Sequence, residues 1–279
     1  MILTTAVTKS CLKDFLLMKK TFEMYHPESF ITVVCDKFCY DYLYDNFKNV
    51  VPILDDSIND GNHVVDNSQQ KQSFKNIISK KFDLAISNNP SPSNPVLWCD
   101  VDHIFINRID DKILTGAESY DAALTPHFSD GFADERTVGY YNCGFAIIFN
   151  DLSLHSWKTL YEKHEDFNLY YEQKPLEVIS RYFNILNLPI NYNFGWWKCI
   201  SNFMGGNMKW INLSKSNDIC WQDKGIVSWH FHYFKNDNHG YQKESMRNIV
   251  KSLLMSRGRN EDQITLHEIE RLSNENIEE

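Results

Sequence analysis

Apolar strands and helical stretches alternate from the start of the chain. Ile2–Val7, Phe30–Cys35 and Val50–Leu54 are β-rich runs, and the stretches between them, 9–25 and 36–47, carry apolar residues at helical spacing. Strands separated by helices indicate βαβ units. The second run, FITVVC, is apolar throughout, as in a parallel strand that is buried on both faces. The sequence therefore predicts an α/β fold.

A further strand is expected in the middle of the chain. Residues 55–70 are polar and predict a surface loop, and residues 70–87 have the periodicity of a helix. The prolines of 88–95 exclude a helix there. The loop leads into the apolar run VLWC at Val96–Cys99, which we expect to be a buried strand.

The second half continues the alternation. Strands are predicted at Ala122–Pro126 and 144–149, and helices at 152–164 and 174–186. From residue 241 the chain is charged and helical in pattern. We expect one domain over residues 1–240, a mixed sheet flanked by helices, and a helical C-terminal appendage over residues 241–279 with a frayed end.

Two carboxylates directly follow the strand at Val96–Cys99. Residues i and i+2 of an extended chain point the same way, so Asp100 and Asp102 can converge on one cation. Open α/β sheets bind ligands beyond the carboxyl ends of their strands. Mg²⁺ and Mn²⁺ prefer oxygen ligands and share their coordination sphere with phosphate oxygens. The pair predicts a metal site that holds a diphosphate; a solvated turn with two acids is the alternative.

Composition and charge weigh against several classes of protein. The chain has a net charge of −9, whereas a dedicated nucleic-acid-binding protein usually carries an excess of basic residues. Seven cysteines without a CxxC pair fit neither a zinc ribbon nor a thioredoxin-like motif, and suit a reducing cytosol. The sequence contains no run of about 18 apolar residues, so we predict no membrane-spanning helix. The N-terminus resembles a strand more than a signal peptide. We expect a cytoplasmic protein (in the host cytoplasm if the chain is viral) without stable membrane insertion; the oligomeric state is open.

Four motifs follow one another along the chain. LWCDVDHIF places an acidic pair after a strand, YYNCGFAIIFN carries an N-x-G strand, YYEQKPLEVI opens a helix with an E-Q pair, and VSWHFHYFK joins His-Phe to a downstream Lys. In this order they resemble the GT-A glycosyltransferases, particularly the glycogenin-like and bacterial galactosyltransferase-related families. The resemblance covers residues 1 to about 240 and implies a Rossmann-like mixed sheet of the GT-A type.

The resemblance also implies a role for each matching residue. Asp102 would be the main metal ligand, Asp100 would bridge metal and ribose, and His230 would be the third ligand. Lys235 would contact the diphosphate. The family motif H-F-x-G-x-x-K has a glycine and one more residue before its lysine than HFHYFK, which leaves the role of Lys235 open. His232 is a competing ligand, because it shares one face of the expected strand with His230; a core or stacked histidine is the alternative for either.

Other matching residues would surround the donor. Asn142 and Gly144 would border the donor sugar, and Glu172 and Gln173 would face its reacting carbon. The family binds the nucleoside at the ends of the first two strands, which here are Thr5, Ala6 and Asp36. For Glu172, the alternative is a solvent-facing acid at a helix N-terminus, where the helix dipole stabilises it. For Asn142, it is a buried turn residue that forms hydrogen bonds.

The function expected on these grounds is metal-dependent transfer of a hexosyl or pentosyl group from a nucleoside diphosphate sugar, with UDP favoured. Retention of configuration is favoured and needs no strong general base. An inverting enzyme would need one, which Asp130, Asp134 or Glu135 could supply from a flap hinged at Gly131 and Gly139. A glycan acceptor could stack on the aromatic residues of the C-terminal half, which are Trp196, Trp197, Phe203, Trp210 and Trp221.

Three other functions use the same features. A phage-type DNA glycosyltransferase would stack modified bases on the aromatic residues, although a glycan acceptor is favoured. A metal-dependent nucleotidyltransferase or phosphohydrolase would need further acidic ligands, for which Asp110 and Asp111 are the nearby candidates. A sugar-binding module without activity would not need the intact acidic pair.

Overall fold

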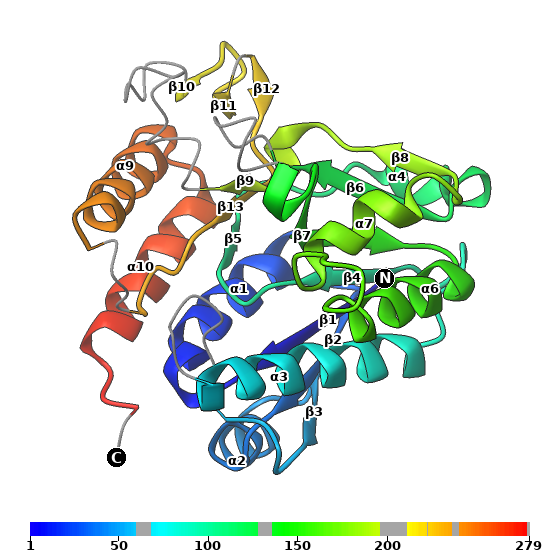
Figure 1. The fold of residues 1–279 in the computed structure, drawn as a ribbon. Coiled ribbons are helices and arrows are strands. Elements are labelled where there is room, and N and C mark those ends of the chain that lie inside the picture. Colours follow the sequence, from blue (N-terminus) through cyan, green and yellow to red (C-terminus); the bar gives the residue numbers. More distant parts are fainter. Residues whose placement is uncertain (60–67, 128–135, 196–210, 222, 236–239, 278–279) are drawn as a thin grey trace. The chain divides into compact units, whose positions relative to one another are not determined.

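The four strands expected between residues 2 and 99 lie side by side in a seven-stranded sheet (Figure 1). The computed structural model describes residues 1–59, 68–127, 136–195, 211–221, 223–235 and 240–277. The strand order in the sheet is β3-β2-β1-β4-β7-β6-β8. The four N-terminal strands pair in parallel and have the predicted bounds: β1 (Ile2–Val7), β2 (Phe30–Cys35), β3 (Val50–Leu54) and β4 (Val96–Cys99).

The other half makes the sheet mixed, as predicted. β7 (Tyr141–Ile148) runs antiparallel to both β4 and β6 (Ala122–Pro126), and β8 (Ile185–Asn187) pairs in parallel with β6 at the edge. Because β7 lies beside β4, the end of β4 that carries Asp100 meets the start of β7. Asp100 N donates a hydrogen bond to Gly144 O over 2.9 Å.

Two predicted elements have different bounds in the structure. The strand predicted at 144–149 begins earlier, at Tyr141, and a register shift opposite Leu124 and Thr125 accommodates the added residues. The helix predicted at 174–186 is wrong beyond its first half, because α7 covers only Gln173–Ile179. Ile185 and the residues after it form β8 instead, since this short apolar run can pair with β6 at the open sheet edge.

Three helices share one core with the sheet (Figure 1): α3 (Ser68–Ser87), α6 (Asp151–Glu162) and α7. At its centre the Trp98 ring of β4 lies 4.6 Å from the Phe82 ring of α3 and 4.7 Å from the Trp157 ring of α6. All three rings are fully buried, so truncating any of them would remove about 3–5 kcal/mol of stability. Further helices are η1 (Lys9–Cys11), α2 (Lys37–Asn46), α4 (Asp111–Thr115), η2 (Ala117–Ser119) and η3 (Ile190–Tyr192).

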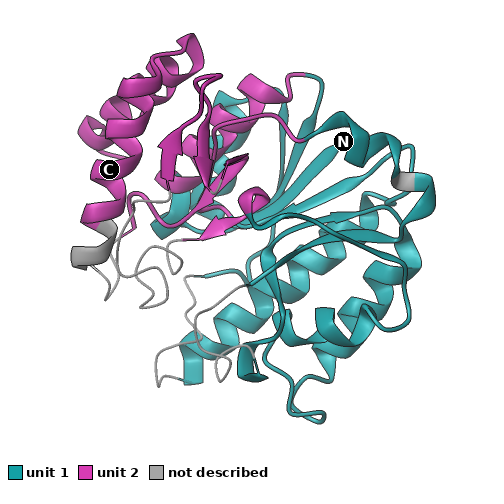
Figure 2. Ribbon diagram, turned by 90° about the horizontal axis from the view of Figure 1, so that it is seen from above, with its two compact units in different colours: residues 1–12, 28–100, 110–190 teal, residues 13–27, 101–109, 191–279 magenta. Residues whose placement is uncertain are grey.

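The described chain divides into two compact units whose segments interleave (Figure 2). Unit 1 consists of residues 1–12, 28–100 and 110–190, and contains the seven-stranded sheet. Unit 2 consists of residues 13–27, 101–109 and 191–279. The domain boundary expected near residue 240 stays a prediction. Of the helices within the described residues, none combines the length and apolarity that a membrane span requires.

Unit 2 joins segments from the two ends of the chain. α1 (Leu12–Tyr25) places Phe22 with its ring 5.1 Å from that of Phe105 in β5 (His103–Phe105). β5 pairs with β13 (Ser228–His230), which also pairs with β9 (Phe194–Gly195). A second small sheet contains β10 (Ile211–Leu213), β11 (Ile219–Trp221) and β12 (Lys224–Gly225).

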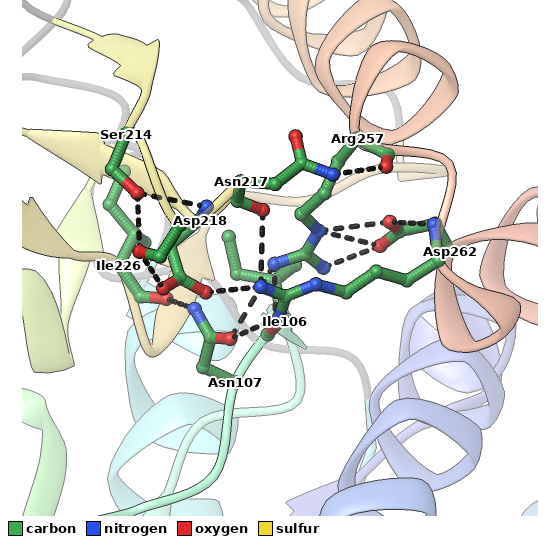
Figure 3. A network of polar contacts seen from close by, with 10 residues as sticks. Ile106, Asn107, Ser214, Asn217, Asp218, Ile226, Arg257 and Asp262 are labelled. Carbon is green, nitrogen blue, oxygen red and sulfur yellow. Dashed lines mark hydrogen bonds and ion pairs between the residues drawn. The ribbon is translucent and has the colours of Figure 1, made fainter.

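The C-terminal residues are helical, as predicted, and form α9 (Gly240–Arg257) and α10 (Asn260–Asn274). Gly258 between them has φ +67°, a left-handed conformation that glycine adopts without strain. Arg257 and Asp262 form a buried ion pair across this turn (Figure 3), with Arg257 Nε 3.0 and 2.9 Å from the two carboxylate oxygens. Arg257 Nη1 also donates to Ile106 O over 3.0 Å, which ties α9 to the residue after β5.

We expect Arg257→Ala to lower the free energy of unfolding by about 3–5 kcal/mol, because it leaves the Asp262 carboxylate buried without its partner. Arg271→Ala is the matched control. Its partner Glu268 lies on the same helix, and the guanidinium is 40% exposed, so the loss should stay below about 1 kcal/mol. Urea denaturation of both variants measures the difference, and equal losses would contradict a structural role for the buried pair.

Candidate functional site

Strand pairing in unit 2 brings Asp102 beside His230. In the antiparallel ladder of β5 and β13, His103 lies opposite His230. Asp102 precedes His103, so it lies at the end of β13, where Phe231 N donates to Asp102 O over 2.8 Å. The side chains meet as well, with Asp102 Oδ1 3.3 Å from His230 Nε2.

The hydrogen bond at the other ring nitrogen determines what His230 offers to Asp102. His230 Nδ1 lies 2.8 Å from Asn193 Oδ1, and an amide oxygen only accepts, so Nδ1 carries the proton. His230 Nε2 faces the Asp102 carboxylate over 3.3 Å. An imidazole nitrogen and a carboxylate oxygen at this distance share a proton or a cation, and together they are a suitable donor set for a divalent metal.

Asp102 is ionised in this environment. Burial alone would raise the pKa of its carboxyl, but the neighbouring His230 and His232 outweigh burial and hold that pKa well below the ordinary value. Asp100 follows β4 directly, and its Oδ1 accepts from Lys81 Nζ over 2.7 Å. Ligand atoms of Asp100, Asp102 and His230 all lie within 4.8 Å of one another. Within the described residues, these three side chains form the group that is spaced to hold a metal ion.

His232 lies outside this group. The expectation that it shares one face of a strand with His230 is wrong, because β13 ends at His230. His232 Nδ1 is 3.1 Å from Asp14 Oδ2, and its Nε2 is 3.9 Å from Asp102 Oδ2. Burial would lower the pKa of His232, but the two carboxylates outweigh it and raise that pKa.

Sequence patterns did not single out Lys81, which the structure places beside Asp100. Its side chain is 2% exposed and its Nζ lies 4.2 Å from the centroid of the Trp98 ring. A buried ammonium group thus lies between an aromatic face and a carboxylate. One signal was available: Lys81 interrupts the apolar stripe of α3, in which Ile78, Phe82 and Ala85 are buried at helical spacing.

The residues predicted to surround the donor sugar form a cluster in unit 1. Asn142 Oδ1 accepts from Gly144 N over 2.9 Å, and Asn142 Nδ2 donates to Gln173 Oε1 over 3.3 Å. Cys143 Sγ is 3.2 Å from Glu172 Oε1. The alternative for Asn142 was a buried turn residue that forms hydrogen bonds. Asn142 is buried and hydrogen-bonded, but it lies in strand β7 and not in a turn.

Glu172 is buried and does not face solvent as a helix-terminal acid would. The preceding residue, Tyr171, has φ +41°, an uncommon conformation for a large side chain that turns the chain into α7. Burial raises the pKa of Glu172 to about 7, and the charge of Asp100 adds to the rise. The Glu172 carboxyl can therefore hold or release a proton near neutral pH.

No protein-family model and no curated protein matches the chain. Solved structures do match. The galactosyltransferase LgtC, in complex with donor and acceptor sugar analogs, aligns with a TM-score of 0.55 at 13% identity, over 89% of this chain and 95% of LgtC. The glycosyltransferase GlyE of Streptococcus pneumoniae TIGR4 aligns with a TM-score of 0.51 at 16% identity, over 82% of this chain and 54% of GlyE. Both share the mixed sheet flanked by helices. The chain has the GT-A fold. At these identities the likeness shows the fold alone.

The strand ends expected to bind the nucleoside lie within unit 1 of this GT-A fold. Both oxygens of Asp36 accept backbone hydrogen bonds over 2.8 Å, from Cys39 N at the start of α2 and from Lys9 N. Thr5 is buried, and its Oγ1 has no partner among the described residues. Ala6 pairs in register with Val34 of β2. Nucleoside binding at Thr5, Ala6 and Asp36 stays a prediction, as does the contact of Lys235 with the diphosphate.

Several other predicted residues of the GT-A chain lie outside the described residues. They are Asp130, Gly131, Asp134, Glu135, Trp196, Trp197, Phe203 and Trp210. Of the proposed hinges, Gly139 is described. It has φ +109°, and a Cβ there would come within 3.1 Å of Lys174 Cα, so a larger residue would be strained. Trp221 ends β11, with its ring 5.9 Å from that of Phe194.

The acidic pair after β5 does not extend the metal group. Asp110 Oδ1 caps α4 by accepting from Lys112 N over 2.9 Å, and Asp111 lies in the first turn of that helix. Neither residue belongs to the group of Asp100, Asp102 and His230.

The raised pKa of Glu172 predicts a pH effect on stability. An unfolded chain releases this proton near pH 4.3, whereas the folded protein keeps it up to about pH 7. In that interval the folded state binds more protons, so stability falls as pH rises, and levels off above pH 7. Glu172→Gln cannot ionise, so its stability relative to wild type should rise across the interval by on the order of 3 kcal/mol. Urea unfolding of both proteins at pH 5 and pH 8 measures this, and parallel pH profiles would contradict it.

Proposed function

We propose that this chain is a metal-dependent glycosyltransferase that moves a sugar from a nucleoside diphosphate sugar, with UDP favoured, to a glycan acceptor. The observation that carries the proposal is the group of Asp100, Asp102 and His230, whose two aspartates directly follow β4 of a GT-A fold. Open α/β sheets bind ligands at this end of their strands. LgtC, which shares the fold, was solved with donor and acceptor sugar analogs.

The donor set suits Mn²⁺ or Mg²⁺. Asp102 and His230 would hold the ion directly, and Asp100 would join it to the ribose. A bound divalent cation would neutralise the charge that builds on the diphosphate as the glycosidic bond breaks. Lys81 holds the Asp100 carboxylate in place through a 2.7 Å hydrogen bond, so the chain keeps this ligand oriented before substrate arrives.

On the sugar side, the protein holds the Gln173 amide at both ends. Its Oε1 accepts from Asn142, and its Nε2 donates to Val138 O over 3.1 Å. One LgtC structure carries an active-site variant in which glutamate replaces glutamine. We infer that Gln173 faces the reacting carbon of the donor, with Glu172 beside it.

Calorimetry with UDP, with and without Mn²⁺, tests the metal site. The wild-type protein should bind UDP only with the metal, and Asp102→Asn should weaken that binding by about 100-fold or more, about 2.7 kcal/mol, because a main ligand loses its charge. Asp110→Asn is the control, since this carboxylate caps α4 outside the metal group. Undiminished metal-dependent UDP binding by Asp102→Asn would overturn the proposal.

Gln173→Ala should separate chemistry from binding. If the amide acts on the reacting carbon, kcat for transfer or donor hydrolysis should fall about 100-fold or more while the affinity for UDP and Mn²⁺ is kept. Lys174→Ala, one residue further along α7, removes an ion pair with Glu177 and should retain wild-type turnover. A panel of sugar nucleotides with glycan acceptors and duplex DNA supplies the readout and identifies the donor. Wild-type kcat in Gln173→Ala would exclude this role.

A further inference from the structure

A single buried carboxylate holds the segment that follows β13. Residues 231–235 form neither strand nor helix. Asp14 of α1 accepts three successive backbone hydrogen bonds from them: Oδ1 from Tyr233 N over 2.6 Å and Phe234 N over 2.8 Å, and Oδ2 from Lys235 N over 3.2 Å. Successive N–H groups that converge in this way form an anion-binding nest. Asp14 fills the nest with a side chain that is 1% exposed.

The same carboxylate reaches the metal group through His232. The His232 ring lies between two carboxylates, with Nδ1 3.1 Å from Asp14 Oδ2 and Nε2 3.9 Å from Asp102 Oδ2. The two oxygens of Asp102 therefore face different imidazoles, since Oδ1 lies 3.3 Å from His230 Nε2. Each imidazole is held at Nδ1 by a buried acceptor, Asp14 for His232 and Asn193 for His230.

We propose that Asp14 is a positioning residue of the metal site and acts through His232 on the orientation of the Asp102 carboxylate. A carboxylate on a short side chain can rotate about its last bond. An imidazole that faces Oδ2 restricts this rotation and leaves Oδ1 turned toward His230. Residues that orient a metal ligand without binding the metal themselves typically change metal affinity 10- to 100-fold.

The Asp14 carboxylate also accounts for a departure from the motif H-F-x-G-x-x-K. The glycine position of that motif is occupied by Tyr233, which does not have a positive φ and needs no glycine. The turn is held instead by the Asp14 carboxylate. A purely structural role for Asp14 would need only the three N–H bonds and would not involve the His232 imidazole that lies between the two carboxylates. A positioning role predicts instead that substitutions of Asp14 and His232 affect Mn²⁺ binding through one shared pathway.

A double-mutant cycle on Mn²⁺ affinity tests the inference, which rests on the proposed function. Mn²⁺ binding is read from the paramagnetic resonance signal of the free ion, without turnover, for Asp14→Asn, His232→Asn and the double variant. Each single variant should weaken Mn²⁺ binding about 10-fold or more. The double variant should bind Mn²⁺ no more weakly than the single variant with the lower Mn²⁺ affinity, because Asp14 acts through His232. His232→Asn keeps the inference testable if Asp14→Asn does not fold, since the His232 side chain is 26% exposed.

Asp262→Asn is the matched control, a buried carboxylate of the same unit that pairs with Arg257. It should lose stability and keep the wild-type Mn²⁺ affinity. The positioning role is overturned if the control weakens Mn²⁺ binding as much as Asp14→Asn, if the two single effects multiply in the double variant, or if His232→Asn binds Mn²⁺ like wild type. In these cases metal-dependent UDP binding by the wild-type protein would still uphold the proposed function. Its absence would overturn the function and the positioning role together.

Discussion

The pairing of β5 with β13 is the interaction on which the candidate site depends. Asp102 and His230 are far apart in the sequence, and the chain pays conformational entropy to bring them together. Burial of the apolar side chains of this small sheet offsets the cost, since Phe105, Phe194 and Trp229 are fully buried. Because His103 pairs with His230 in this ladder, the Asp102 carboxylate and the His230 imidazole lie side by side at the strand ends.

Buried charges around this contact have partners, but the partners differ in kind. The Arg257 guanidinium is enclosed by Asp262 and by Ile106 O, and both charges are satisfied within the protein. Such a pair ties elements together. Asp102 instead has its two oxygens 3.3 and 3.9 Å from the Nε2 atoms of His230 and His232, and it belongs to a group that is spaced to hold a metal ion.

Local pattern predicted most of the GT-A sheet. β1 to β4 are apolar runs bounded by clear turn signals, so their bounds follow from the residues alone. The same rule was wrong at β8, because Ile185 and Leu186 suit helix and strand equally and only the open edge of β6 decides between them. The strand that the family resemblance implied at His232 was also wrong, because β13 ends at His230 and the residues after it donate three N–H bonds to Asp14.

The sequence by itself determined the α/β class, the strand before Asp100 and Asp102, and the order of the four motifs, because these depend on residues that are neighbours along the chain. Tertiary structure alone brought His230 within ligand distance of the acidic pair, placed Lys81 beside Asp100, and buried Glu172, which raises the pKa of its carboxyl to about 7. Each of these depends on side chains from separate elements whose distance no local pattern encodes. Desolvation and hydrogen-bond partners, which give the groups their chemistry, exist only after the chain has packed.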